Sequence, residues 1–269
     1  MNIIIPAYNC SNTINRTLDS LVTQINSNFS VTIVDDCSTE DIYTLICKYQ
    51  DKLDIKYIRN EVNVGCGMSR QKGIDETDSN YIAFLDSDDI LLPNAVQIWL
   101  MEIEKSKPDV IYTPFFSINK NIINIKRDSL FMCHGKVYNT DFMRKYDIRE
   151  SVDVKCNDDS YLNWQAFDLA TNVSLLNEPT YLWINTPNSV THKDFFTIRA
   201  IDEFQYAKNL AKNQIMRFKE NPLSNYNTIN TQVYKILNQN NEKYKTIAND
   251  IRITKIKEVN QNVYSSRSN

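Results

Sequence analysis

The sequence predicts an α/β fold built on a doubly wound, mainly parallel sheet, followed by a helical C-terminal region. In the first half of the chain, short apolar runs rich in β-branched residues alternate with segments of helical periodicity. Several of these runs end abruptly in polar or acidic residues, as strands of an open parallel sheet do at the edge where ligands bind. A chain that alternates strand and helix in this way lays its strands side by side in parallel.

The first two strands and the helices after them follow from residue type. Residues 2–5 form an apolar run that stops at Pro6, and residues 31–34 form a second run. Ser11 is a suitable N-cap for the helix between them. The apolar residues of that helix recur at near-helical spacing: Ile14, Leu18, Leu21, Val22 and Ile25. A second helix is expected from about Asp41, with these residues on one side: Leu45, Ile46 and Tyr49.

Further elements continue the alternation and then change its pattern. A strand at 55–58, a helix near 68–75 and a strand at 81–85 complete a βαβαβαβ order, and a helix-like segment follows Pro93. Short β-like pieces and one helix are then expected, at 110–113, 115–118, 122–125 and 140–146. The last elements expected before the tail are a helix at 159–170 and strands at 173–176 and 180–184.

We expect two domains, residues 1–194 and a helical region at 195–269. From Lys235 onward, seven Lys or Arg residues stand against three acidic residues, a local balance of +4. A solvated helix face explains this balance, and a contact with a membrane surface or with a second subunit is the alternative.

The composition excludes several classes of protein. The net charge is −3, so nothing in the total indicates a nucleic-acid binder. The six cysteines are scattered and form no C-x-x-C pair, which indicates free thiols in a reducing compartment. The sequence begins MNIIIPAYN, which is not a signal peptide of the usual form, and no stretch is apolar enough to span a membrane. We therefore expect a cytoplasmic protein whose membrane contact, if it has one, is peripheral.

An acidic cluster directly follows the apolar run 81–85. Asp86, Asp88 and Asp89 lie within four residues, at the edge of the sheet where ligands bind. Carboxylates this close repel one another unless a cation lies among them, and a hard divalent ion with oxygen ligands is the natural candidate. The alternative is a polar turn with a helix cap, which Asp and Ser favour for their own hydrogen bonds.

Other polar residues converge on the same edge. Tyr8 and Asn9 follow the first strand, where Tyr8 could stack on a planar base, and Asp36 follows the second, where it could accept a hydrogen bond from a base imide. Arg70 lies in NVGCGMSRQKG, residues 63–73, whose glycines allow close backbone approach and whose arginine can pair with a phosphate. This stretch is neither a Walker loop nor a G-x-G-x-x-G motif.

Four motifs in this order resemble the family 2 glycosyltransferases, which have the GT-A fold. They are IIPAYN at 4–9, VDDCS at 34–38, the 63–73 segment and LDSDDILLP at 85–93. Three later segments resemble the bacterial polysaccharide, lipopolysaccharide and teichoic-acid transferases: HGKVY at 134–138, NDDSYL at 157–162 and YLWINTPNSVT at 181–191. The resemblance covers about residues 1–192.

The resemblance implies a site for a nucleotide sugar and a divalent ion, Mn²⁺ or Mg²⁺. Tyr8 and Asp36 would hold the uracil, and Arg70 would contact the base or the diphosphate. Asp88 would ligate the metal, and Asp86 would touch the ribose or a metal-bound water, or ligate the metal with Asp88. The remaining residues on the nucleotide-sugar side would be Pro6, Ala7, Asn9, Ser87 and Ser189, with His192 as a further candidate near the diphosphate.

The resemblance also implies a catalytic base and an acceptor side. Asp159 would take the proton from the attacking hydroxyl, with Asp158 as the alternative base, and direct displacement would invert the anomeric carbon. Lys136 and His134 would lie on the acceptor side. Other interpretations remain open. Asp158 and Asp159 could cap the following helix, and Lys136 could lie on the surface. His134 and His192 could each be a surface or packing residue.

Two residues depart from the family pattern. Cys37 replaces the glycine of D-D-G-S, so the backbone there must tolerate a side chain. Asp158 stands where Glu is usual, which leaves open whether Asp158 or Asp159 is the base. A Q-x-x-R-W motif, which marks processive synthases, is missing from the sequence.

The sequence therefore predicts a metal-dependent, inverting, non-processive hexosyl- or N-acetylhexosaminyl-transferase. It would move a sugar from a UDP-sugar to a cell-surface polysaccharide, a teichoic acid or a lipid-linked precursor. One alternative is a sugar-nucleotide-binding module without catalysis. The other is a nucleotidyltransferase, which needs a Gly-rich, Arg-bearing loop after the first strand, where this chain has PAYNCS.

Overall fold

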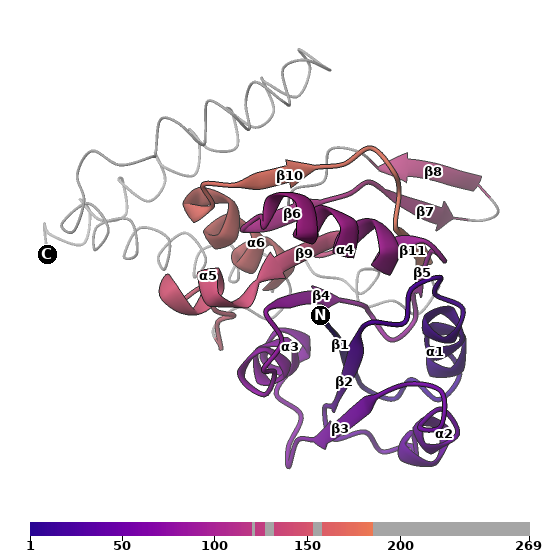
Figure 1. Cartoon of the computed structure of the whole chain (residues 1–269). Coiled ribbons are helices and arrows are strands. Elements are labelled where there is room, and N and C mark those ends of the chain that lie inside the picture. The colour runs from indigo at the N-terminus through magenta and orange to yellow at the C-terminus, as the bar shows by residue number, and fades with distance from the viewer. Residues whose placement is uncertain (120–121, 127–131, 153–157, 185–269) are drawn as a thin grey trace, which may run out of the picture. The chain divides into compact units, whose positions relative to one another are not determined.

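The computed structural model describes residues 1–119, 122–126, 132–152 and 158–184. The predicted helical region 195–269 and its boundary at residue 194 lie outside these residues, as do Ser189 and His192. Within them, strands and helices follow one another in the α/β order that the sequence predicts (Figure 1).

A seven-stranded sheet forms the centre of the described part of the chain. Its strand order is β10-β6-β9-β4-β1-β2-β3. The strands are β1 (Asn2–Ala7), β2 (Ser30–Asp35), β3 (Ile55–Arg59), β4 (Tyr81–Phe84), β6 (Val110–Tyr112), β9 (Lys136–Asn139) and β10 (Val173–Leu175). β1 pairs in parallel with β2 and β4, and β2 pairs in parallel with β3, which confirms the predicted parallel order. β9 matches no predicted strand and is antiparallel to both of its neighbours, β4 and β6.

A four-stranded sheet, in the order β5-β11-β7-β8, lies beside the first. Its strands are β5 (Ile90–Leu91), β7 (Phe115–Asn119), β8 (Ile122–Lys126) and β11 (Tyr181–Ile184). β11 is parallel to β7 and antiparallel to β5, and the second pairing places Tyr181 opposite Leu91. This pairing joins the end of the described chain to the acidic turn that follows β4.

Helices cover both faces of the large sheet, as expected for a doubly wound fold. They are α1 (Ile14–Val22), α2 (Tyr43–Cys47), α3 (Cys66–Asp75), α4 (Ala95–Ser106), α5 (Thr140–Lys145) and α6 (Asp158–Leu169). Figure 1 shows α1 and α2 on one side of β1, β2 and β3, with α3 on the other. Helix α1 begins at Ile14 rather than near Ser11, because the Ser11 amide donates to the Glu40 carboxylate at 3.1 Å and Thr13 takes the N-cap position.

The hydrophobic core has two parts, one on each face of the sheet. Alternate residues of β1 separate them, with Ile3 and Ile5 in one part and Ile4 in the other. The first part includes residues of α1, α2 and α4, and the second includes residues of α3, α5 and α6. Because both faces of β1 are covered, the strand is apolar from Ile3 to Ala7 rather than alternating.

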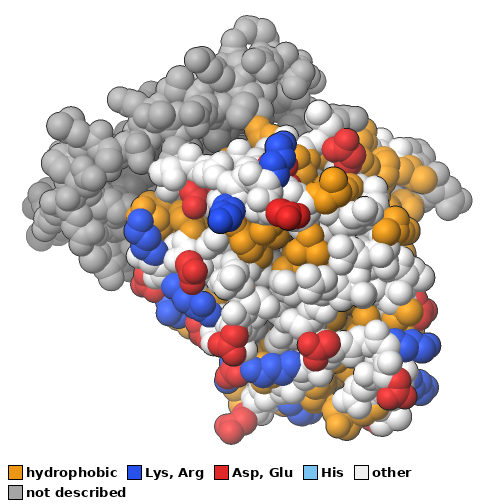
Figure 2. Space-filling model, in the orientation of Figure 1, with side chains coloured by type: hydrophobic (Ala, Val, Ile, Leu, Met, Phe, Trp, Pro, Cys, Tyr) orange, Lys and Arg blue, Asp and Glu red, His pale blue; other side chains and the backbone are white. Residues whose placement is uncertain are grey.

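The surface of the described residues carries charges of both signs. On the face shown in Figure 2, basic and acidic side chains are interspersed and form no basic stripe of the kind that nucleic-acid binding requires. Among the described residues, we find no helix with the length and apolar character needed to cross a bilayer.

The backbone at Cys37 has the left-handed conformation that the missing glycine implied. Its φ is 61°, and its thiol lies 3.4 Å from the Glu61 carbonyl oxygen. Left-handed backbone brings Cβ close to the following carbonyl oxygen, so a side chain here is unfavourable relative to glycine. The turn that follows β2 thus keeps its shape despite the substitution.

We predict that Cys37→Gly stabilises the protein by about 0.5 kcal/mol, because relief of the left-handed backbone outweighs the added chain entropy of glycine. The matched variant Cys47→Gly, in α2, should destabilise it by about 0.5–1 kcal/mol, since glycine is unfavourable in a helix. Urea denaturation of both variants measures the two signs. Destabilisation by both substitutions would contradict the strain at Cys37.

Candidate functional site

The acidic turn after β4 is held in a fixed shape by its neighbours. The Asp89 amide donates to the Asp86 carbonyl oxygen at 3.1 Å, which closes the turn. From α1, the Thr17 hydroxyl donates to the Asp89 carbonyl oxygen at 2.9 Å, and Arg16 donates to that of Asp88. These bonds fix the backbone of the turn from which the carboxylates of Asp86 and Asp89 face the site.

Arg70 lies at the centre of the site and joins three segments. From α3, its guanidinium binds the carboxylate of Asp86 at 2.8 Å, that of Asp158 at 2.8 Å, and that of Asp159. The Arg70 side chain is almost fully buried, and its guanidinium lies 5.8 Å from the centre of the Phe84 ring. The prediction that Arg70 contacts the base or the diphosphate stays a prediction, since in this structure its hydrogen bonds are to carboxylates.

Asp158 and Asp159, at the start of α6, differ in their surroundings. The Asp158 side chain is 12% exposed and that of Asp159 is 21% exposed. Asp158 packs on α3 at Gly67, where an added Cβ would lie 2.8 Å from the Asp158 Cβ. Burial raises the pKa of Asp158 to about 6, although Arg70 opposes the shift. Asp159 is therefore the carboxylate more accessible to a substrate.

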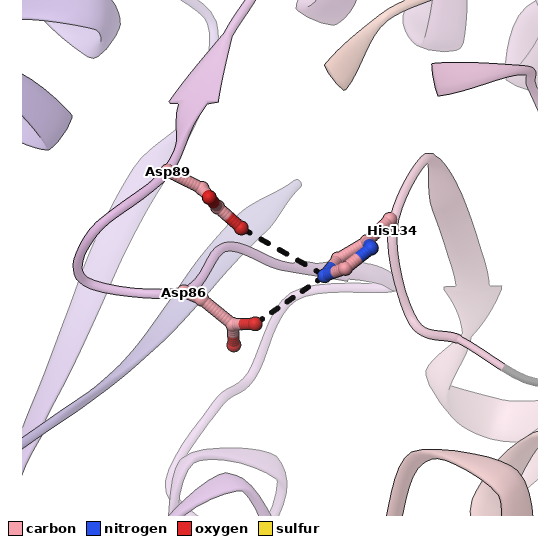
Figure 3. A group of neighbouring side chains, drawn as sticks. All are labelled: Asp86, Asp89 and His134. Carbon is pink, nitrogen blue, oxygen red and sulfur yellow. Dashed lines mark hydrogen bonds and ion pairs between the residues drawn. The ribbon is translucent and has the colours of Figure 1, made fainter. Parts of the chain in front are cut away.

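A second group of side chains could hold a metal ion (Figure 3). One ligand atom each from Asp86, Asp89 and His134 lies within 4.8 Å of the others. The His134 Nε2 atom is 3.4 Å from Asp86 Oδ2 and 3.7 Å from Asp89 Oδ2. The Tyr181 hydroxyl donates to Asp89 Oδ2 at 2.6 Å, and the Ile184 amide donates to Asp89 Oδ1 at 2.8 Å. Two carboxylates and an imidazole are a ligand set that suits a divalent cation.

The charges of this group favour a cation. Burial raises the pKa of Asp89 well above its usual range, and the neighbouring carboxylates of Asp86 and Asp88 raise it further. Burial alone would also raise the pKa of Asp86, but Arg70 and His134 bring it below the usual range. A divalent ion would relieve the crowding of negative charge that disfavours the ionised form of Asp89. The residues present therefore fit such an ion.

The structure groups Asp89, rather than Asp88, with Asp86. The resemblance implied Asp88 as a metal ligand. Its side chain is half-buried and is not part of this group, and its role as a ligand stays a prediction. Burial, and then the charge of Asp86, raises the pKa of Asp88. The difference arises because Tyr181 and Ile184 of β11 bind the Asp89 carboxylate and hold it beside His134.

The predicted nucleotide side lies at the ends of β1 and β2. Pro6 and Ala7 are buried in β1, whereas Tyr8 is 49% exposed, as a stacking side chain must be. Asn9 accepts hydrogen bonds from the amide and hydroxyl of Thr39. Ser87, in the acidic turn, is half-buried. These residues lie at the edge that the sequence predicts, and their contacts with a nucleotide remain predictions.

Asp36 has a structural role that its sequence position does not reveal. Its Oδ1 atom accepts bonds from the Val64 amide at 2.8 Å and the Asn60 side chain at 3.0 Å, and its Oδ2 atom accepts from the Gly65 amide at 2.8 Å. The carboxylate therefore orders the loop that leads into α3 and Arg70. Its predicted bond to a base imide would be made in addition to these three.

Lys136 does not lie on the surface, which was one of its two interpretations. Its side chain is fully buried, its ammonium donates to the Met132 carbonyl oxygen, and it lies 5.1 Å from the centre of the Tyr112 ring. Burial lowers the pKa of Lys136 to about 8. His134, the other residue predicted on the acceptor side, is also buried and faces Asp86 and Asp89.

Three residues of the site were not predicted. Asp89 was identified only as part of the acidic cluster, and Tyr181 and Cys133 were not singled out. The Cys133 amide donates to Asp159 Oδ2 at 3.0 Å. Tyr181 could have been found from its place in the 181–191 segment, which resembles the family. No sequence pattern could have identified the Cys133 amide, because every residue except proline carries a backbone amide donor.

This chain is similar to curated bacterial glycosyltransferases, two of which, GlyA and TarS, are much longer than it is. Glycosyltransferase GlyA of Streptococcus pneumoniae is 27% identical over 68% of this chain and 30% of its own length. The poly(ribitol-phosphate) β-N-acetylglucosaminyltransferase TarS of Staphylococcus aureus is 25% identical over 68% of this chain and 35% of its own length. The Escherichia coli enzyme WfaP, a UDP-Glc:α-D-GlcNAc-diphosphoundecaprenol β-1,3-glucosyltransferase, is 39% identical over 39% of this chain and 42% of its own. The chain thus spans about a third of the length of GlyA and TarS.

Solved structures share the fold. TarS residues 1–349 in complex with UDP-GlcNAc match 79% of this chain and 65% of that chain, with a TM-score of 0.71 and 21% identity. A mannosyltransferase from Pyrobaculum calidifontis, in complex with GDP-Man and Mn²⁺, matches 94% of this chain and 79% of that chain, with a TM-score of 0.59 and 11% identity. The match to TarS confirms the predicted GT-A fold.

The family match agrees with the fold and with the residues at its ligand-binding edge. The family model described as Glycosyl transferase family 2 matches residues 2–159, a span that runs from β1 through the acidic turn to Asp159. Because this span is more than half of the 269 residues, the chain belongs to glycosyl transferase family 2.

Proposed function

We propose that this chain transfers a sugar from a UDP-sugar to a hydroxyl of a cell-surface polysaccharide, a teichoic acid or a lipid-linked precursor. The observation that carries the proposal is the juxtaposition of two groups at the ligand-binding edge of the sheet. One is the Asp86–Asp89–His134 group, and the other is Asp159 held by Arg70. In a family 2 chain, these supply a place for a cation and a base.

The names of the relatives support a UDP-sugar as the donor and inversion of the anomeric carbon. TarS and WfaP are named as β-transferases, WfaP is named for UDP-Glc, and a TarS structure contains UDP-GlcNAc. Because the sugar of these donors is α-linked to the diphosphate, a β-product requires inversion at the anomeric carbon. UDP-GlcNAc and UDP-glucose are therefore the first donors to test.

Each residue of the site has a proposed task in a single displacement. Asp86, Asp89 and His134 would hold Mn²⁺ or Mg²⁺, which when bound neutralises charge on the departing UDP. Asp159 would take the proton of the acceptor hydroxyl as its oxygen bonds to the anomeric carbon and the bond to the diphosphate breaks. Asp159 suits this task better than Asp158, because Asp158 packs against Gly67 and is less exposed.

The remaining proposals concern the substrates and the location. Tyr8 would stack on the uracil, and Asp36 would accept a bond from its imide. The acceptor would approach Asp159 from the more exposed side of the site. A UDP-sugar donor and a lipid-linked acceptor would place the reaction at the cytoplasmic face of a membrane, which the chain would contact peripherally.

The proposed function is tested by incubating the protein with UDP-GlcNAc, UDP-glucose, GDP-mannose and CMP-sialic acid, with Mn²⁺ or with chelator. We expect slow, Mn²⁺-dependent release of UDP from one UDP-sugar. Asp159→Asn should lower the turnover number at least about 100-fold, as expected for loss of a general base, while UDP still raises the melting temperature. UDP binding without turnover by the wild-type protein, including in the presence of lipid-linked acceptors, would instead indicate a binding module.

The composition of the metal site is tested by substitution of its members. We expect His134→Gln and Asp89→Asn each to raise the Mn²⁺ concentration for half-maximal UDP release by about 10–100-fold, since each replaces one ligand with a neutral amide that binds the ion more weakly. Asp88→Asn is the comparison variant, and its effect should be smaller. If Asp88→Asn alone raises the Mn²⁺ requirement, the D-x-D assignment is right and the group in Figure 3 is not the metal site.

The pKa of Asp158 predicts how its substitution changes stability with pH. The folded-state pKa of about 6 lies above the ordinary aspartate value of 3.8, so the folded state binds more protons between these values. The contribution of Asp158 to stability is therefore present below about pH 4 and is lost as the pH rises to about 6. Urea denaturation from pH 4 to pH 7 should show a smaller loss of stability in Asp158→Asn than in the wild-type protein. Equal losses in both would contradict the raised pKa.

A further inference from the structure

One turn, Cys133–Lys136, connects the two halves of the site. The Lys136 amide donates to the Cys133 carbonyl oxygen at 3.3 Å, and Gly135 has a φ of 66°, which the turn requires. At its first residue, the turn presents the Cys133 amide to Asp159, and at its second, the His134 ring to Asp86 and Asp89. The turn therefore contacts both Asp159, the proposed base, and the carboxylates of the candidate metal group.

The Asp159 carboxylate is held at both of its oxygens. Arg70 binds Oδ1 from α3, and the Cys133 amide donates to Oδ2 at 3.0 Å from the turn. Two donors on different oxygens fix the direction in which a carboxylate faces, which a single ion pair does not do. The direction of Asp159 therefore depends on where the backbone of Cys133 lies.

Two buried side chains contact the sulfur of Cys133. Asn163, one turn after Asp159 in α6, donates to the Asp159 carbonyl oxygen at 2.7 Å and lies 3.5 Å from the Cys133 sulfur. The Tyr138 hydroxyl, from β9, donates to Asn163 Oδ1 at 2.7 Å and lies 3.8 Å from the same sulfur. Both side chains are at most 1% exposed, so water does not compete for these bonds.

The opposite end of the turn is anchored independently. The amide and the hydroxyl of Thr113 each donate to the Gly135 carbonyl oxygen at 2.8 Å. A Cβ at Gly135 would lie 2.5 Å from the Thr113 carbonyl oxygen, so the backbones pack directly against each other. Asn163 and Tyr138 contact the other end of the turn, at Cys133.

We propose that Asn163 and Tyr138 are positioning residues for the catalytic base, acting on Asp159 through the Cys133 amide. The proposal rests on the proposed function, in which Asp159 is the base. Apolar side chains of similar size would fill the same space without polar groups to satisfy, and buried polar groups contribute to stability only when they are bonded. Here both side chains contact the Cys133 sulfur, and Asn163 also binds the Asp159 carbonyl oxygen. They therefore hold the two residues whose amide and carboxylate bind each other, which assigns them a role in orienting the base.

The test uses Tyr138→Phe and Asn163→Ala in the full chain, with UDP-GlcNAc, UDP-glucose and Mn²⁺ as probes. We expect each variant to lower the turnover number for UDP release about 10-fold and to leave the Michaelis constant for the UDP-sugar within about 2-fold of wild type, since an interaction made only in the transition state is lost. Unchanged turnover in both variants would overturn the proposal, and so would a rise in the Michaelis constant at constant turnover.

The matched control is Tyr49→Phe. Tyr49 is also a buried tyrosine, and its hydroxyl donates to Asp19 at 2.9 Å and to the Asn15 carbonyl oxygen at 3.2 Å, on α1. Its loss should lower stability by about 1 kcal/mol, as the loss of one buried hydrogen bond does. Turnover should not change. If Tyr49→Phe lowers turnover as much as Tyr138→Phe, the effect is one of general stability, and the proposal is wrong.

Crystal structures of the wild type and Asn163→Ala give a readout that does not depend on activity. We expect the distance from the Cys133 nitrogen to Asp159 Oδ2 to lie near 3.0 Å in the wild type and beyond hydrogen-bonding distance in the variant. An unchanged distance in the variant overturns the positioning role even if turnover falls. If wild-type protein turns over no UDP-sugar, the proposed function fails, and these two structures still decide whether Asn163 sets the position of Asp159.

Discussion

The Arg70 guanidinium is the interaction on which the site depends. It joins α3 to the acidic turn after β4 and to the start of α6, three segments that are far apart in the sequence. A buried guanidinium without partners would be strongly unfavourable, so the fold brings carboxylates to it from each side. One positive charge faces three carboxylates, those of Asp86, Asp158 and Asp159, and Asp89 adds a fourth nearby. The remaining negative charge is what makes the site suited to a divalent cation.

The two sheets have different tasks around this centre. The large sheet delivers Asp86 and the nucleotide-side residues at the ends of parallel strands, as open α/β sheets do. The small sheet contributes β11, whose Tyr181 and Ile184 hold the Asp89 carboxylate. The antiparallel strand β9 lies between β4 and β6 and begins with the turn that carries His134. The candidate metal group therefore forms only when both sheets are in place.

The sequence predicted the edge of the sheet well and the individual contacts less well. The acidic turn, Arg70, Asp158 and Asp159 come together in the structure, through the ion pairs of Arg70. The resemblance implied Asp88 as a metal ligand, which stays a prediction, and the structure brings Asp89 and His134 to Asp86, because β11 binds the Asp89 carboxylate. Lys136 was interpreted as either a surface residue or an acceptor-side residue. The structure buries its side chain, which excludes the first interpretation and leaves the second as a prediction. A pattern of residue types does not predict the direction in which a side chain at the end of a strand points.

Local chemistry along the chain determined the alternation of strands and helices and the apolar strands covered on both faces. These depend on residue type and on neighbours a few positions away, so the sequence alone was sufficient. Long-range packing decided the rest: the place of β9, the roles of Asp36 and Asp89, and the contact of the Cys133 amide with Asp159. Each of these is a bond between residues at least about 25 positions apart, and only the folded chain brings such residues within hydrogen-bonding distance.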